Sequence, residues 1–160
     1  MLLLSGAPVS RKHREQAARV VVEPCPYVEA MAAIVARHRR RGRIIPPQVR
    51  ACLRATLDGV PVGYAVIGEP SSRHLNPQGE VRRVVSWAWG AASALYRAAE
   101  AAGACLTYTD PDEPGHSLRA AGWFIDRVGK TGPYWSSRPG REPGAGRGLR
   151  VRWRPPSWHK

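Results

Sequence analysis

The sequence predicts an α+β domain in which a mixed central sheet is flanked by helices on both faces. Two observations lead to this prediction. The dipeptide Asp58-Gly59 joins strand-like runs at 52–58 and 62–67, which is typical of an antiparallel hairpin. An alanine-rich segment at 89–102 predicts a helix between two further strand-like runs, and a strand–helix–strand unit of this kind pairs its strands in parallel. A sheet that contains both kinds of pair is mixed.

The other elements follow from local patterns along the chain. The β-branched run from Val20 to Val22 predicts a first strand over 19–23, which Pro24 ends. Apolar residues at helical spacing predict a helix over 27–41. After the hairpin we expect a strand at 80–85, the helix at 89–102, a strand at 104–109, a short helix at 115–121 and a strand at 122–128.

The length of 160 residues favours one compact domain with two appendages. Residues 1–18 are charged and show no apolar periodicity, so we expect a flexible leader. The domain itself is expected over 19–131. Residues 132–160 are basic and rich in glycine, proline and tryptophan, which predicts a C-terminal tail that lies on the surface of the domain or on a partner.

The charge balance points to a polyanionic partner. Lysine and arginine number 25 against 12 acidic residues, so the formal net charge is +13. Arginines cluster between 37 and 54, where no acid occurs, and again in the C-terminal tail. Nucleic acid is the commonest partner of such clusters, because phosphates supply sequence-independent affinity. The alternative is an arginine-rich composition with no anionic partner.

Other classes of protein receive no support. No apolar run is long enough to cross a bilayer, and Met1 to Leu4 is too short for a signal peptide. Cys25, Cys52 and Cys105 form no paired motif, so we expect reduced thiols, a cytoplasmic location and no disulfide framework. The five histidines are scattered without ligand spacing, and we expect no metal site.

Several segments together resemble a known family. The most specific is 113–123, which reads Glu-Pro-Gly-His-Ser-Leu-Arg-Ala-Ala-Gly-Trp. With Glu80-Val-Arg-Arg-Val84, Ala92-Ser-Ala-Leu-Tyr96 and Leu106-Thr-Tyr-Thr109, it resembles the GNAT superfamily of N-acyltransferases. The resemblance is closer to a small phage and prophage branch of GNAT-like proteins, which is distantly similar to the Mom DNA-modification protein. It spans residues 20–154.

The resemblance implies an enzyme that moves an acyl group from acetyl-CoA or another acyl-CoA to an amine, on phage DNA or a modified nucleobase. A phage protein of this kind acts in the cytoplasm of its bacterial host. In the superfamily, backbone N–H groups at the start of a helix cradle the pyrophosphate. The implied cofactor-binding residues are Val84 and Val85 for the thioester carbonyl and Gly90, Ala91, Ala92 and Ser93 for the phosphates. Trp87 and Trp89 depart from the small polar residues usual in this loop.

The catalytic residues also follow from the resemblance. The superfamily's usual tyrosine acid falls at Leu118, so the substitutes that we consider are Tyr96, Tyr108, Ser117 and His116. On the acceptor side, His38 is a candidate base for the amine. The arginines that follow or precede it are candidate nucleic-acid-binding residues, namely Arg37, Arg39, Arg40, Arg41 and Arg43. Each of these residues also has an ordinary structural role open to it, as a solvated or capping side chain.

Two other functions stay open. The bulky Trp87 and Trp89, with the leucine at 118, suit a non-catalytic, basic nucleic-acid-binding protein on a degenerate GNAT scaffold. A transferase for a small amine or a protein is the weaker possibility.

Within the predicted strand at 80–85, we expect Glu80 to pair with Arg82 or Arg83, because an unpaired buried charge is costly.

Overall fold

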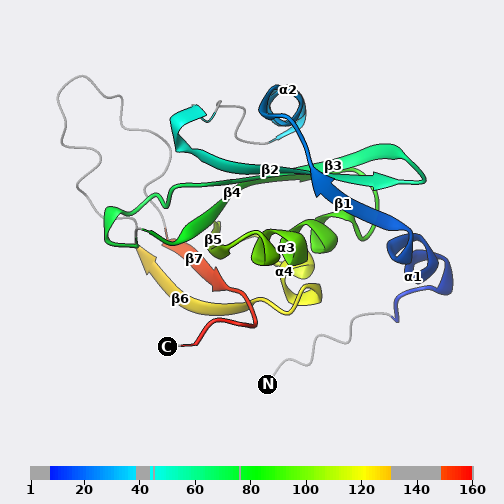
Figure 1. The fold of residues 1–160 in the computed structure, drawn as a ribbon. Coiled ribbons are helices and arrows are strands. Elements are labelled where there is room, and N and C mark those ends of the chain that lie inside the picture. The colour runs from blue at the N-terminus through cyan, green and yellow to red at the C-terminus, as the bar shows by residue number, and fades with distance from the viewer. Residues whose placement is uncertain (1–7, 39–43, 45, 76, 131–148, 160) are drawn as a thin grey trace.

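A computed structural model describes residues 8–38, 44, 46–75, 77–130 and 149–159 (Figure 1). Seven strands form one mixed sheet in the order β1-β2-β3-β4-β5-β7-β6, so the predicted α+β class is confirmed. The strands are β1 (Val20–Pro24), β2 (Val49–Leu57), β3 (Val60–Gly68), β4 (Gly79–Ser86), β5 (Ala104–Thr109), β6 (Phe124–Lys130) and β7 (Leu149–Arg154). The α-helices are α1 (Arg11–Ala18), α2 (Tyr27–Arg37), α3 (Ala91–Ala101) and α4 (His116–Ala120), with 3₁₀ turns at Pro46–Gln48 and Arg73–Leu75.

The β2–β3 hairpin forms where the sequence predicts it. Asp58 and Gly59 both have positive φ angles, of 51° and 82°. Two successive left-handed residues make the tight turn whose twist matches that of the flanking strands. The strand over 104–109 is also found as predicted, while the helix over 27–41 ends earlier, at Arg37.

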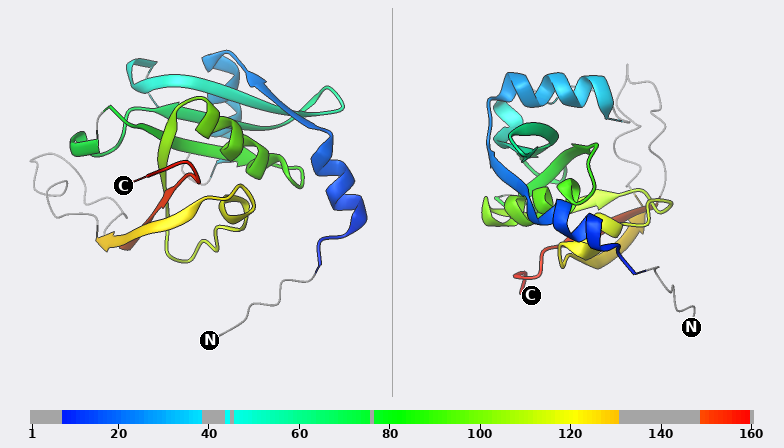
Figure 2. Two further views of the ribbon diagram at one scale, coloured as in Figure 1. Left: turned by 60° about the horizontal axis from the view of Figure 1, so that its bottom comes forward. Right: turned by 90° about the vertical axis from the view of Figure 1, so that its right-hand side faces the viewer.

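Helices cover both faces of the sheet, as predicted. In Figure 1, α2 lies above the sheet, and α3 and α4 lie below it. The two further views in Figure 2 show the same layering. Two separate apolar clusters fill the spaces. One lies under α2 and includes Met31, Ile34 and Val66, and the larger one includes Leu95 and Trp153.

The sheet consists of two antiparallel parts joined by a short parallel ladder. β3 and β4 are registered from Gly63 opposite Ser86 to Gly68 opposite Glu80. In contrast, β4 and β5 pair only at Gly79–Val81, although β4 continues to Ser86. A bulge at Arg82 interrupts the β3–β4 register at the point where the parallel pairing ends. The second half of β4 therefore runs on without β5 beside it.

The structure differs from the predicted leader. Arg11–Ala18, which we expected to be flexible, form the helix α1. Ser10 caps it, because its hydroxyl accepts a hydrogen bond from the backbone N–H of His13 at 3.3 Å. The helix is polar on every side, so no apolar periodicity marked it in the sequence.

The structure also differs from the predicted tail. Leu149–Arg154 form β7, which lies between β5 and β6 inside the sheet. Val151 and Trp153 alternate with arginines, and both are buried in the larger core. The glycine- and proline-rich composition of the segment before β7 concealed this alternation. Residues 131–148 themselves lie outside the described part of the chain.

In the described part of the chain, no helix is both long enough and apolar enough to span a membrane.

Candidate functional site

An opening between β4 and β5 is the feature around which the candidate site lies. Past Val81 the two strands no longer pair, while the other edge of β5 pairs with β7 through Thr107 to Thr109. The last β4–β5 pair, Val81 and Thr107, forms the joint between the two parts of the sheet. The Thr107 hydroxyl holds this joint by donating a hydrogen bond of 2.9 Å to the Val81 carbonyl. Such an opening lets groups on the two faces of the sheet approach each other, which a continuous ladder would prevent.

The expected cofactor-binding residues lie together along the end of β4 and the start of α3. Val84 and Val85 belong to the half of β4 that pairs with β3 but has no β5 beside it. Gly90 is the N-cap of α3, with a left-handed φ of 85° that favours glycine. Ala91, Ala92 and Ser93 form its first turn. The N–H groups of Ala92 and Ser93 have no intrahelical acceptor there, whereas that of Ala91 donates a hydrogen bond of 3.2 Å to the Ala88 carbonyl.

These residues fit the phosphates of a coenzyme A in size and polarity. Ala92 and Ser93 are small and partly exposed, which leaves room beside their N–H groups, and the helix dipole favours an anion there. The Ser93 hydroxyl bonds to the Gly90 carbonyl at 3.1 Å, which closes the turn. One side of this loop, however, is in contact with α1.

Three residues of α1 contact the loop between β4 and α3. The His13 ring stacks on Trp89 with 5.0 Å between the ring centroids and 12° between the planes. The Gln16 side-chain amide donates a hydrogen bond of 3.5 Å to the Trp89 carbonyl. A β-carbon built on Gly90 would lie only 2.7 Å from the β-carbon of Ala17. No pattern in the sequence predicted these contacts.

On the opposite face of the sheet, the C-terminal end of α2 meets the end of β4. The Arg37 guanidinium lies 4.1 Å from the centre of the Trp87 ring. Tyr64 approaches the same ring, with 6.1 Å between the centroids. His38 is half-buried and caps α2, its backbone N–H donating to the Ile34 carbonyl. This places His38 and Arg37 near the end of β4. Of the other predicted arginines, Arg39, Arg40, Arg41 and Arg43 lie outside the described residues.

The predicted acid candidates lie on or near the α3 and α4 side. The rings of Tyr96 and Trp123 pack with 5.8 Å between their centroids, and burial raises the pKa of the Tyr96 hydroxyl. His116 is the exposed first residue of α4. Tyr108 belongs to β5 and lies opposite Arg152 of β7. Leu118, which stands at the place of the superfamily's tyrosine, is fully buried in the core. The structure thus brings Tyr96 and His116 to the helical layer on one face and His38 to the other face.

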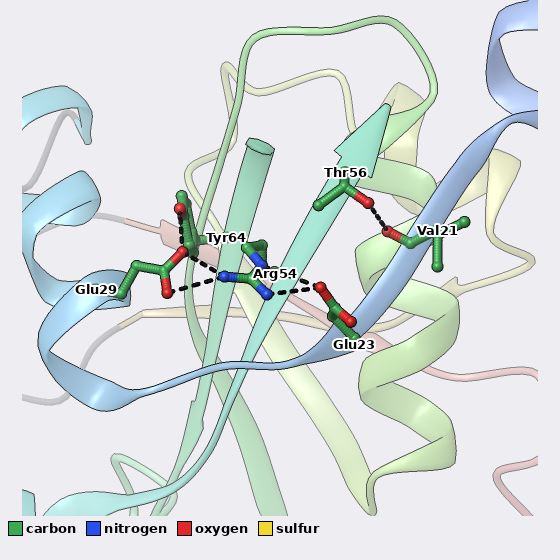
Figure 3. Close-up of polar contacts among 6 residues, drawn as sticks. All are labelled: Val21, Glu23, Glu29, Arg54, Thr56 and Tyr64. Carbon is green, nitrogen blue, oxygen red and sulfur yellow. Dashed lines mark hydrogen bonds and ion pairs between the residues drawn. The ribbon is translucent and has the colours of Figure 1, made fainter. Parts of the chain in front are cut away.

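A polar network beneath α2 is a feature that the sequence analysis missed (Figure 3). Arg54 of β2 bonds to both oxygens of Glu29, at 2.9 and 3.0 Å, and to Glu23 of β1 at 2.6 Å. The Tyr64 hydroxyl donates a hydrogen bond of 2.7 Å to the same Glu29 carboxylate. Close by, the Thr56 hydroxyl bonds to the carbonyl of Val21 at 3.5 Å. The network joins three strands to the first turn of α2.

The network sets the ionisation of its members. The hydrogen bond from Tyr64 and then those from Arg54 lower the pKa of Glu29, so this carboxyl is ionised at neutral pH. Burial and the Glu29 carboxylate together raise the pKa of Tyr64 to about 12. Glu29 already accepts from two partners, which makes it a structural group and a poor base for an incoming amine.

The expected ion pair in β4 is present. Arg82 Nε lies 3.9 Å from a carboxylate oxygen of Glu80. Glu80 is buried and accepts hydrogen bonds from both the backbone N–H and the hydroxyl of Ser71, at 2.6 and 3.1 Å. The pair fixes the loop before β4. Cys25, Cys52 and Cys105 are free thiols, and the described residues contain no cluster of three or more metal-binding side chains.

Comparison with known proteins identifies the fold. No protein-family model matches the chain, and no curated protein matches its sequence. Solved structures do match. An acetyltransferase of the GNAT family from Streptococcus pneumoniae superimposes with a TM-score of 0.51 at 12% identity, covering 85% of this chain and 98% of that one. The ribosomal-protein-S18-alanine N-acetyltransferase of Escherichia coli superimposes with a TM-score of 0.53 at 12% identity, covering 88% of this chain and 96% of that one.

A third match was solved with a ligand. The Bacillus subtilis acetyltransferase in complex with CoA superimposes with a TM-score of 0.50 at 11% identity, over 84% of this chain and 95% of that one. Identities this low show the fold alone. The chain therefore has the fold of the GNAT acetyltransferases, and its function must be argued from its own residues.

Proposed function

We propose that this protein is an acyl-CoA-dependent N-acyltransferase whose acceptor is an amine of DNA or of a modified nucleobase. The single observation that carries the proposal is the opening between β4 and β5, which leads directly to the small-residue first turn of α3. A thioester donor with phosphates needs both parts, namely a place for the acyl group and N–H groups for the anion.

The donor would be held by the loop and the strand end. Backbone N–H groups between Gly90 and Ser93, chiefly those of Ala92 and Ser93, would bind the phosphates, and the backbone near Val84 and Val85 would face the thioester carbonyl. The coenzyme supplies an activated acyl group. The chain supplies orientation, because the opening is the place where a donor on one face of the sheet and an acceptor on the other can meet.

Two proton transfers must accompany the transfer of the acyl group. The attacking amine loses a proton when the new C–N bond forms, and the leaving sulfur gains one when the C–S bond breaks. His38 is our candidate to accept the first proton, because an imidazole titrates near neutral pH. Tyr96 is a candidate donor for the second, because a tyrosine hydroxyl carries its proton at neutral pH. Tyr108 and His116 are the alternatives.

The nucleic-acid acceptor is supported by charge. The net charge of +13 and the arginines from 37 to 43 would attract a phosphate backbone to the end of α2 where His38 lies. The exposed ring of Trp87, with the Arg37 guanidinium over it, adds a flat surface suited to a nucleobase. A phage-encoded protein acting in its host cytoplasm agrees with this acceptor.

Titration of the pure protein with acetyl-CoA by calorimetry, at low and at moderate salt, tests the donor. We expect saturable binding that survives moderate salt, whereas nonspecific attraction to a basic protein is screened. The acceptor is tested by incubating the protein with acetyl-CoA and DNA and measuring the masses of the released nucleosides. His38→Ala should abolish any modified nucleoside while leaving acetyl-CoA binding unchanged. Absence of acetyl-CoA binding at both salts would contradict the proposal.

A second candidate function is a non-catalytic nucleic-acid-binding protein on the same scaffold. The contacts between α1 and the Trp89–Gly90 segment favour it, because they occupy one side of the donor loop. This protein would bind DNA with a strong salt dependence and would not bind acetyl-CoA. The same titration therefore separates the two functions.

A further inference from the structure

The helix α1 contacts the donor loop through one face. His13, Gln16 and Ala17 are spaced three and four residues apart, so they project from the same side of the helix. Their partners are the ring of Trp89, the carbonyl of Trp89 and the backbone of Gly90. The bulky Trp89, which departs from the superfamily pattern, and the left-handed Gly90 together form a seat for α1.

The seat lies where a ligand of the loop would need space. Because Ala17 lies so close to Gly90 that not even a β-carbon fits between them, no phosphate oxygen can reach Gly90 from that side while α1 is docked. The amide of Gln16 already bonds to the loop carbonyl at 89. In Figure 1, α1 lies at the end of the molecule where α3 begins.

In the described part of the chain, few contacts hold α1 apart from those with this seat. It has eight residues, and none of them is buried. Its internal ion pair, Arg11 with Glu15, is exposed to solvent. A helix of this length is marginal when isolated in water, so its order depends on the tertiary contacts that it makes. Within the described residues, a ring stack, a hydrogen bond of 3.5 Å and an alanine contact join it to the loop.

We propose that α1 is an autoinhibitory cover of the loop between β4 and α3, which an acyl-CoA must displace in order to bind. This inference rests on the proposed function, because it concerns access to the same donor site. The docked state lowers the apparent affinity for the donor by the fraction of molecules in which the loop is free. The cover keeps the site closed to solvent and anions when the donor is scarce.

The test uses the full chain with the double variant His13→Ala/Gln16→Ala, which removes the stack and the hydrogen bond. The control is Arg11→Gln/Glu15→Gln, which changes the same helix by two residues, keeps the net charge and does not touch the loop contacts. In acetyl-CoA titrations we expect the first variant to bind about tenfold more tightly than the natural sequence, since a stack and a hydrogen bond together are worth roughly that factor. The control should stay within about twofold, as removal of an exposed pair does.

Hydrogen exchange gives a second readout on the unaltered protein. Acetyl-CoA should speed exchange of the backbone amides at 14–18, because displaced α1 loses its helical hydrogen bonds. Equal affinity in the natural sequence and the His13→Ala/Gln16→Ala variant would overturn the cover and leave the proposed function standing. Weaker binding by the variant, or slower exchange in α1, would make α1 a part of the site and overturn the cover as well. Absence of acetyl-CoA binding in every variant would overturn both proposals.

Discussion

The two faces of the sheet are held to their helices by different kinds of interaction. Under α3 and α4 the contact is a large apolar core, in which Leu95 and Trp153 are almost fully buried. Under α2 a smaller apolar cluster is bordered by a charged network that links Glu29 to Arg54 and Tyr64. The first face depends on the removal of apolar area from water, and the second on groups that must stay ionised and paired.

The two kinds of interaction differ in what they contribute to the molecule. The apolar core packs Trp153 of β7 and Leu95 of α3, the helix that follows the loop after β4. The polar face carries the end of α2, where His38 and Arg37 lie. Polar networks fix geometry while contributing less net free energy than apolar burial of similar extent. We therefore expect the two faces to respond unequally to comparable substitutions.

Trp153→Ala should have the largest effect. Trp153 is 1% exposed, and its indole N–H donates a hydrogen bond of 2.9 Å to the Thr109 hydroxyl. We expect a loss of about 3–5 kcal/mol in the free energy of unfolding, measured in urea. Trp158→Ala is the matched control, because the ring of Trp158 is partly exposed and lies 3.9 Å from the Arg154 guanidinium, and it should cost about 1 kcal/mol or less. Equal effects of the two substitutions would contradict the placement of β7 in the core.

Tyr64→Phe examines the polar face with a smaller change. It removes the hydroxyl that donates to Glu29 and keeps the buried ring. We expect a loss of about 1.5 kcal/mol in the free energy of unfolding, the usual cost of a hydrogen bond to a charged group. Tyr108→Phe serves as the control, and its hydroxyl donates to no described residue. If Tyr64→Phe left stability unchanged, the network would not hold α2.

Thr107→Val tests the joint between the two halves of the sheet. The substitution keeps the shape of the side chain and removes the hydrogen bond to the Val81 carbonyl. A loss of about 1 kcal/mol is expected. Amide exchange should rise in β5 more than in β2, because β2 lies on the far side of the joint. Uniform exchange across the whole sheet would show that the opening is not a separate weak point.

Acid should weaken the polar face before the apolar one. The folded pKa of Glu29 lies below its unfolded value, so its contribution to stability is present above the unfolded pKa of about 4.3 and is lost as the pH falls through the folded value. The difference in unfolding free energy between the natural sequence and Glu29→Gln should therefore shrink below about pH 4. Urea titrations at pH 7, 4 and 3 measure it. A constant difference would rule out an ionised Glu29 as the cause.

The sequence predicted those elements that short-range patterns encode. The Asp58-Gly59 turn and the strand at 104–109 depend on neighbouring residues, and both are found as expected. β7 was missed because its partners β5 and β6 are distant in the chain and only the pair Val151 and Trp153 marks it. α1 was missed because a polar helix has no apolar period.

The candidate site shows the same division. The resemblance indicated the segment from Val84 to Ser93, and the structure places these residues together at the end of β4 and the start of α3. Nothing in the sequence indicated that Arg54 would join Glu29 and Glu23, which lie 25 and 31 positions away. Pairings of this kind arise from the register of the strands, and a single sequence does not encode them in any local motif.

The position of β7 also has a consequence for synthesis on the ribosome. The chain emerges in the order β5, β6, β7, yet the finished sheet has β7 between the other two. Until residue 154 has left the exit tunnel, the nascent chain carries β5 with one backbone edge open and β6 with no strand to pair with. Open edges of this kind attract other strands. The nascent chain is therefore most exposed to wrong strand pairing in the interval between the emergence of β6 and that of β7.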